Sequence, residues 1–359
     1  MTEERIPTAI LGASGYIGQH FARLLGDHPW FAPPLLVAGP RSEGKRLEEA
    51  WQLAEEPPAA LAPVRLVRST PRALAGSGVR VAFSALPSGS AGRFESELVR
   101  RGVSVFSNAA DHRLDRAGTL LVPEVNGGEL RGPRPGRRRA RLVTNPNCSA
   151  AGLVLALAPV WPLLRPRVVH VATYQAISGA GLPGVPALSL GDNVLPYIAE
   201  EEEKIAREST KLLRPWIAMT GGRGAEFYAN CARVAVRDGH LEAVTVEARD
   251  RPREAELGRA WSQFDPLRAL DLPMAPHPPV EVRPESDRPQ PVRDRWAGRP
   301  PRARGMAAVV GRIRWTPPFL RFFLLSHNAV RGGAGGSVLN AELALARGLL
   351  GPPIAAGAG

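Results

Sequence analysis

A glycine-rich turn near the N-terminus constrains the fold more than any other feature of this chain. The segment IPTAILGASGYIGQHFARLL, residues 6–25, reads as strand, turn and helix, because its apolar positions change to helical spacing after Gly18. The turn spaces Gly12, Gly15 and Gly18 as GxxGxxG. Small residues let a backbone approach a pyrophosphate, and a helix start offers N–H groups to an anion. The pattern therefore predicts a dinucleotide site, with glycine packing as the alternative.

Strand and helix patterns alternate through the next hundred residues. LLVAGP (35–40), VRVAFSALP (79–87) and VSVFSNAA (103–110) read as strands, and SAGRFESELVRRG (90–102) has helical spacing. Such alternation is typical of an α/β domain with a Rossmann-type, doubly wound parallel sheet. After the second strand, Arg41, Ser42 and Lys45 suit a 2′-phosphate and favour NADP, although Glu43 and a plain solvated turn leave this open.

The pattern changes after residue 148, and 359 residues exceed one ordinary core. We therefore predict a second, α+β domain with a mixed sheet. Its strand-like segments, rich in β-branched residues, are VVHVATYQAIS (168–178), EFYANCARVAV (226–236) and HLEAVTVEAR (240–249). The expected boundaries give residues 1–147 to the NADP-binding domain and residues 148–329 to the second domain.

Two cysteines stand in different contexts. Cys148, in TNPNCSAAG, precedes an apolar run, and a cysteine at a helix start is stabilised as a thiolate by the helix dipole. Asn147 could cap that helix or contact a ligand. Packing remains an even alternative for Cys148 on this evidence alone, whereas Cys231 lies in an apolar strand pattern and is expected to be packed.

Basic side chains gather around the dipeptide Asp238-Gly239, a strong signal for a type I′ hairpin. In such a hairpin Arg233 and His240 share a face about 13 Å apart, at ~3.3 Å per residue, and could bracket a small substrate. The acidic run at residues 200–203 would ordinarily be a solvated helix start.

The charge of the chain is +12, from 46 basic and 34 acidic residues. Part of the excess lies in GPRPGRRRAR (132–141) and in residues 283–304. Solvated arginine-rich loops explain it better than a nucleic-acid surface, which we keep as a distant alternative, and the charge could attract anionic substrates. No export signal, membrane-spanning run or metal motif is evident, so we expect a cytoplasmic protein with free thiols.

Many pieces of the chain, in order and spacing, resemble the aspartate-β-semialdehyde dehydrogenase family, particularly its archaeal and fungal-like branch. The resemblance covers nearly the whole length. The pieces are GASGYIGQ, RSEGK, VAFSALPS, VFSNAADHRLD, LVPEVN, TNPNCSAAGLVLAL, TYQAISGAGLPGVP, DNVLPYIAEEEEKI, CARVAVRDGH and LSHNAVRGGAGGSVLNAEL.

The resemblance implies an NADPH-dependent reduction of L-aspartyl-4-phosphate to L-aspartate-4-semialdehyde and phosphate, in amino-acid biosynthesis, by a homodimer or homotetramer. It also implies that residues 148–329 serve catalysis and dimerisation, and that residues 330–359, with the C-terminal helix, complete the NADP-binding domain. It implies that Cys148 is the nucleophile, which carries the acyl group as a thioester. His240 matches the general acid/base, and Gln175 matches the residue that orients the intermediate.

The remaining implied contacts divide between substrate and cofactor. The substrate set is Arg233 for a carboxylate, Glu201 and Lys204 for amine and phosphate, and Arg113 and Asn147 for phosphate. The NADP set is Gly12, Ser14, Gly15, Ile17, Arg41, Ser42, Ser84, Gly335 and Asn340.

Three departures from the family pattern leave substrate alternatives open. GASGY is similar to N-acetyl-γ-glutamyl-phosphate reductase, a sister family with the same chemistry. Ala232 stands beside Arg233 where an asparagine is usual. The insert at 132–141 has no role in the family picture. A paralogue acting on another acyl phosphate or on an acyl-CoA such as malonyl-CoA is the alternative.

Overall fold

The computed structural model describes residues 5–132 and 140–350 of the chain. It divides into two compact units. Of the described residues, the first unit contains 5–121, 128–132, 140–145 and 334–350, and the second contains 122–127 and 146–333. Residues 133–139 of the arginine-rich insert lie outside the described residues. Within the described part of the chain, no helix is long and apolar enough to cross a membrane.

The first unit is built on a six-stranded sheet in the order β2-β1-β3-β4-β6-β5, and every adjacent pair is parallel. Its strands are β1 Thr8–Leu11, β2 Leu35–Val37, β3 Val81–Ser84, β4 Ser104–Ser107, β5 Thr119–Leu120 and β6 Leu142–Thr144. Its helices are α1 Tyr16–Leu25, α2 Leu47–Ala50, α3 Pro71–Gly76, α4 Ala91–Arg100 and α13 Gly335–Ala346. The strand order reverses at β1, which is the doubly wound arrangement that the sequence predicts.

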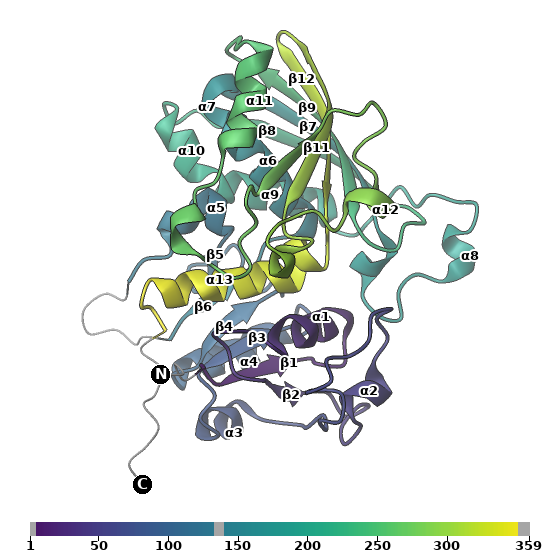
Figure 1. The fold of residues 1–359 in the computed structure, drawn as a ribbon, viewed down its shortest axis with the longest axis vertical. Coiled ribbons are helices and arrows are strands. Elements are labelled where there is room, and N and C mark those ends of the chain that lie inside the picture. The colour runs from purple at the N-terminus through teal and green to yellow at the C-terminus, as the bar shows by residue number, and fades with distance from the viewer. Residues whose placement is uncertain (1–4, 133–139, 351–359) are drawn as a thin grey trace. The chain divides into compact units, whose positions relative to one another are not determined.

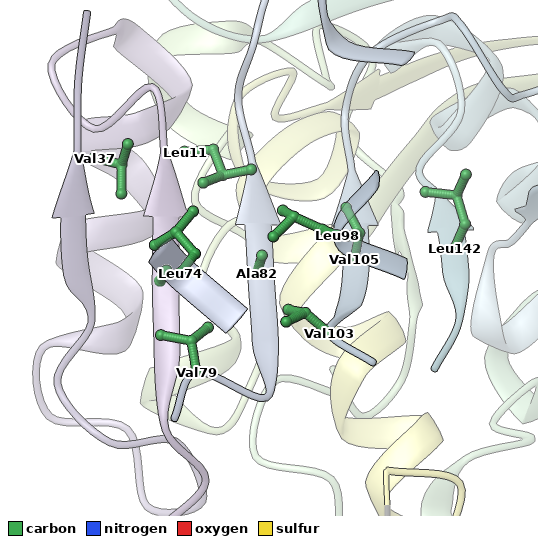
Figure 2. Close-up of a cluster of buried hydrophobic side chains, with 10 residues drawn as sticks. Leu11, Val37, Leu74, Val79, Ala82, Leu98, Val103, Val105 and Leu142 are labelled. Atoms are coloured by element: carbon green, nitrogen blue, oxygen red, sulfur yellow. The ribbon is translucent and has the colours of Figure 1, made fainter. Parts of the chain in front are cut away.

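The central strands of this sheet are buried on both sides because helices cover both of its faces. Figure 2 shows one face, where Leu11, Ala82 and Val105 of neighbouring strands meet Leu74 of α3 and Leu98 of α4. The other face is aromatic, and its helices α1 and α13 pack against each other. The C-terminal helix thereby completes the first unit.

The second unit contains a mixed six-stranded sheet in the order β10-β11-β12-β9-β7-β8. Figure 1 labels five of these strands, all but β10. Its strands are β7 Pro166–Gln175, β8 Glu226–Arg233, β9 His240–Ala248, β10 Val280–Arg283, β11 Ala308–Thr316 and β12 Phe319–Ser326. Its helices are α5 Pro123–Asn126, α6 Cys148–Leu157, α7 Trp161–Leu164, α8 Ala187–Leu190, α9 Glu201–Leu212, α10 Arg214–Met219, α11 Glu254–Gln263 and α12 Pro291–Asp294. Helices α6 and α9 pack together beside the sheet.

The predicted hairpin at Asp238-Gly239 is wrong. Strand β7 lies between β8 and β9, parallel to the first and antiparallel to the second. Only Gly239 of the dipeptide adopts a left-handed φ, of 98°, whereas a type I′ turn needs both residues there. The end of β8 and the start of β9 therefore meet at one end of β7, which brings Arg233 and His240 together instead of 13 Å apart.

Candidate active site

A row of polar side chains crosses the second sheet at the C-terminal end of β7. Arg233 pairs with Gln175, and Ser326 pairs with His240. Gln175 follows Tyr174, whose partner is Leu241, so Gln175 and His240 are neighbours as well. Alternation along each strand turns Arg233, Gln175 and His240 toward the buried face, where their exposures are 7%, 1% and 0%.

Cys148 is the first residue of α6 and stands over this row. Its Sγ lies 3.1 Å from Nε2 of His240. The helix begins there because the side-chain oxygen of Asn147 accepts hydrogen bonds from the backbone N–H groups of Ser149 and Ala150, at 3.0 and 3.1 Å. Asn147 is thus the helix cap that the sequence offered as one of its two possible roles.

The protonation of the His240 ring follows from its second contact. The backbone N–H of Ala176 donates to Nδ1 at 3.0 Å. A backbone nitrogen can only donate here, so Nδ1 is an acceptor and the proton of the neutral ring sits on Nε2. The Nε2–H group therefore points at the sulfur, which accepts it best as a thiolate.

The surroundings keep this imidazole neutral. Burial, and next the positive charge of Arg233, lower the pKa of His240 from 6.5 to about 3, against a smaller opposing effect of Asp238. Arg233 is itself held by a hydrogen bond from Nη1 to the carbonyl oxygen of Ala176, at 2.8 Å. The peptide at residue 176 thus fixes both side chains.

A buried carboxylate on α9 joins the row to the nucleophile turn. Oε1 of Glu201 accepts from Nε2 of Gln175 at 2.9 Å and from Nδ2 of Asn147 at 2.7 Å. Lys204, one turn later, lies 2.9 Å from Glu200 in a partly exposed ion pair. The structure therefore gathers Cys148, His240, Gln175, Arg233, Glu201 and Asn147 around one point, with Lys204 on the same helix.

Two glycines let backbone approach these side chains closely. A β-carbon on Gly179 would lie 2.6 Å from Nη1 of Arg233 and 3.2 Å from Cε1 of His240. A β-carbon on Gly332 would lie 2.6 Å from Cβ of Cys148. The neighbouring Arg331 forms a two-point ion pair with Glu124, at 2.7 Å for each contact, and both are nearly fully buried. Sequence reasoning did not find these two glycines as site residues, and nothing local distinguishes them from turn glycines.

In the first unit, the glycine turn has the geometry that a dinucleotide requires. Gly12 has a φ of 79°, and a β-carbon on it would lie 2.8 Å from the oxygen of Ala85. A β-carbon on Gly18 would lie 2.0 Å from the oxygen of Gly12, so the turn packs tightly against α1. Gly15 is the N-cap of α1 and offers no side chain there, which leaves the helix start open to an anion with Ser14 and Ile17 beside it.

The other cofactor candidates differ in setting. Arg41 is exposed and Ser42 partly exposed in the turn after β2, as a contact to a 2′-phosphate requires. Ser84, by contrast, is fully buried at the end of β3, and its hydroxyl hydrogen bonds to the buried Glu95, whose pKa is raised by burial. The backbone of Ser84 is buried as well, and its carbonyl oxygen accepts from the N–H of Asn108 at 3.0 Å.

The remaining candidates of the first unit are Arg113, Gly335 and Asn340. Arg113 is 9% exposed and donates from Nη2 to the carbonyl oxygen of Asn108, at 2.7 Å. Gly335 begins α13, and Asn340 lies fully buried along it, with Nδ2 3.4 Å from the oxygen of Leu121. Asn340 thus links α13 to the sheet.

Each of the two units contains a segment that matches the model of a known protein family. Residues 7–132 match the family model of the semialdehyde dehydrogenase NAD binding domain. Residues 157–331 match that of the semialdehyde dehydrogenase dimerisation domain.

Three relatives extend this match over nearly the whole chain. An aspartate-semialdehyde dehydrogenase of Archaeoglobus fulgidus is 42% identical, over 94% of this chain and 98% of the relative. A malonyl CoA reductase (NADP) of Metallosphaera sedula is 35% identical, over 96% and 98%. The crystal structure of the Candida albicans aspartate semialdehyde dehydrogenase with NADP superposes with a TM-score of 0.83 at 30% identity, over 96% and 99%.

Proposed function

This chain belongs to the aspartate-semialdehyde dehydrogenase family, and on that premise we propose that it reduces L-aspartyl-4-phosphate to L-aspartate-4-semialdehyde with NADPH. The observation that carries the proposal is the 3.1 Å contact between Sγ of Cys148 and a neutral His240 whose Nε2–H faces the sulfur. A thiolate at a helix N-terminus adds readily to carbonyl and acyl-phosphate carbons.

The covalent steps balance around this sulfur. In the biosynthetic direction, the thiolate of Cys148 attacks the acyl carbon of aspartyl phosphate, a C–S bond forms, and the C–O bond to phosphate breaks. The nicotinamide supplies hydride when the cofactor is bound, and the thioester carbon becomes the carbon of a hemithioacetal. The Nε2–H group of His240 donates a hydrogen bond to the oxygen that gains charge. This oxyanion then collapses to the aldehyde as the C–S bond breaks and the thiolate of Cys148 is released.

The charged side chains of the site are complementary to the charged groups of this substrate. We assign the α-carboxylate to Arg233 and the ammonium group to Glu201, because each carries the opposite charge and points into the row. Gln175, held by Glu201, orients the acyl oxygen. Arg113, Lys204 and Asn147 are the side chains that the family resemblance assigns to phosphate, and Asn147 also caps α6 beside the thiol.

For the cofactor, we assign NADP to the turn and helix start at Gly12, Ser14, Gly15 and Ile17 and to Gly335 and Asn340. Arg41 and Ser42 face solvent after β2, where a 2′-phosphate would distinguish NADP from NAD. In this assignment residues 1–147 and 330–359 bind the cofactor, and residues 148–329 carry catalysis and dimerisation. Ser84 belongs to this set by the family resemblance, although it is fully buried at the end of β3.

The second candidate function is malonyl-CoA reduction, which the Metallosphaera sedula relative favours. Ala232, the departure beside Arg233, does not support it, because alternation along β8 places Ala232 on the opposite face of the sheet. The buried carboxylate of Glu201 favours a substrate with an ammonium group, which malonyl-CoA lacks. We therefore rank aspartyl phosphate first.

We also propose a homodimer or homotetramer, built on the face of the second sheet that turns away from α6 and α9. This face exposes Tyr174, Tyr228 and Phe319 at 41%, 50% and 44%. The match to a dimerisation domain supports this, and light scattering tests it. A thiol nucleophile also suits the reducing cytoplasm, where we place the protein.

One assay separates the candidates. Purified protein is mixed with aspartate semialdehyde or malonate semialdehyde, with NADP or NAD, and with phosphate or coenzyme A. We expect NADP reduction that depends on aspartate semialdehyde and phosphate and that disappears in Cys148→Ser. Turnover with malonate semialdehyde and coenzyme A alone would instead establish the second function.

A further inference from the structure

Helix α9 carries a second buried carboxylate, Glu208, which the reaction described above does not use. It lies seven residues after Glu201 on the same face of the helix and is 2% exposed. Its Oε2 accepts a hydrogen bond from the backbone N–H of Asn147 at 2.5 Å. A carboxylate that accepts from a backbone N–H makes a strong, charge-assisted hydrogen bond.

Asn147 is consequently held on several sides. Its backbone N–H goes to Glu208, and its side-chain N–H goes to Glu201, at 2.7 Å. Its side-chain oxygen caps α6, and its backbone oxygen accepts from Ala151 at 2.9 Å. Two carboxylates of α9 thus accept hydrogen bonds from the residue that immediately precedes the nucleophile.

The position of the Cys148 sulfur depends on these two hydrogen bonds from Asn147. Cysteine has a single side-chain torsion before its sulfur, so the backbone at residues 147 and 148 largely decides where Sγ lies. Gly332 closes the space behind Cβ of Cys148 and limits adjustment on that side. A small displacement of the turn would lengthen the 3.1 Å contact to Nε2 of His240.

We propose that Glu208 is a positioning residue for the nucleophile, which keeps the sulfur of Cys148 within hydrogen-bond reach of His240. The inference rests on the proposed role of Cys148 and deepens it. A purely electrostatic role makes the opposite prediction, because removal of a nearby negative charge would favour the thiolate. The charged and titratable groups near the turn include His240 and Glu242 on β9, Arg233 on β8, Asp238 between these strands, Glu201 and Glu208 on α9, and the Glu124–Arg331 pair.

The test measures the reactivity of the thiol itself. Iodoacetamide alkylation rates of Cys148 are recorded from pH 5 to pH 10 in wild type, Glu208→Gln, Glu208→Ala and the control Glu203→Gln. Glu203 lies on the same helix and is exposed. Glu208→Gln keeps the shape and an oxygen acceptor, so it carries the test if Glu208→Ala does not fold. Thermal unfolding and steady-state kinetics accompany each profile.

We expect Glu208→Gln to raise the pH midpoint of alkylation by about one unit, because the sulfur loses part of its hydrogen bond from Nε2. We expect kcat to fall on the order of tenfold with little change in KM, since placement of the nucleophile and not binding is affected. Glu203→Gln should match wild type. A midpoint that is unchanged or lower in folded Glu208→Gln would overturn the proposal. Retained turnover in Cys148→Ser would instead overturn the proposed function and leave the alkylation result intact.

Discussion

The protonation of His240 is the feature on which the chemistry depends most directly. Burial and Arg233 lower the pKa of this imidazole from 6.5 to about 3. Since one pKa unit corresponds to ~1.36 kcal/mol, charging His240 inside the fold costs about 5 kcal/mol more than in water. The perturbation that exposes this cost is a decrease in pH from 7.5 to 5.

The effect on stability has a definite sign. Well above pH 6.5, His240 is neutral in both folded and unfolded chains and carries no penalty. Below that pH His240 is protonated in the unfolded chain but not in the folded chain, so the free energy of unfolding falls as pH falls. At pH 5 the loss is about 2 kcal/mol, and it grows until the pH approaches the folded pKa. In His240→Asn this part of the pH dependence should vanish.

Nitrogen NMR of protein labelled at histidine measures the same property at the atom. His240→Asn identifies the His240 signals by their loss. We expect a protonated Nε2, an unprotonated Nδ1 and no titration between pH 8 and 5. A ring that titrates near pH 6.5, or a neutral ring with its proton on Nδ1, would refute the reasoning from burial, Arg233 and the Ala176 N–H group.

Other variants test the packing around the thiol. Gly332→Ala places a β-carbon against Cβ of Cys148 and should displace the nucleophile. We expect iodoacetamide alkylation at pH 8 to slow on the order of tenfold or more. Gly128→Ala is the control, because a β-carbon there meets no atom within 4 Å. Glu124→Gln leaves Arg331 buried without its carboxylate partner and should lower the free energy of unfolding in urea by about 3 to 5 kcal/mol; a loss below about 1 kcal/mol contradicts this. Burial raises the pKa of Cys231 to about 12, so mass spectrometry of native protein at pH 8 should find alkylation at Cys148 and none at Cys231.

The sequence allowed the first unit to be predicted well, because its signals are local. A glycine turn between strand and helix, and alternating strand and helix patterns, require no knowledge of distant segments. The helix behind Cys148 was found in the same way, from the asparagine before it and the apolar run after it. The family resemblance then supplied roles that periodicity alone does not contain.

The strand order of the second sheet was harder to predict from the sequence, because which strands become neighbours depends on the whole chain. The local hairpin signal at Asp238-Gly239 paired β8 with β9, but β7 lies between them. Glu208 was missed for a related reason. Its partner, the N–H of Asn147, is 61 residues away in the sequence, and a glutamate in a charged helix ordinarily faces solvent.

The central claim is that Cys148 carries the acyl group of the substrate as a thioester. Wild-type protein is incubated with aspartate semialdehyde and NADP without phosphate, quenched in acid, and analysed by peptide mass spectrometry. We predict an aspartyl adduct on the peptide that contains Cys148, stoichiometric with the NADPH formed and discharged when phosphate is added before the quench. NADPH formation with no adduct on that peptide, or with an adduct elsewhere, would contradict the account.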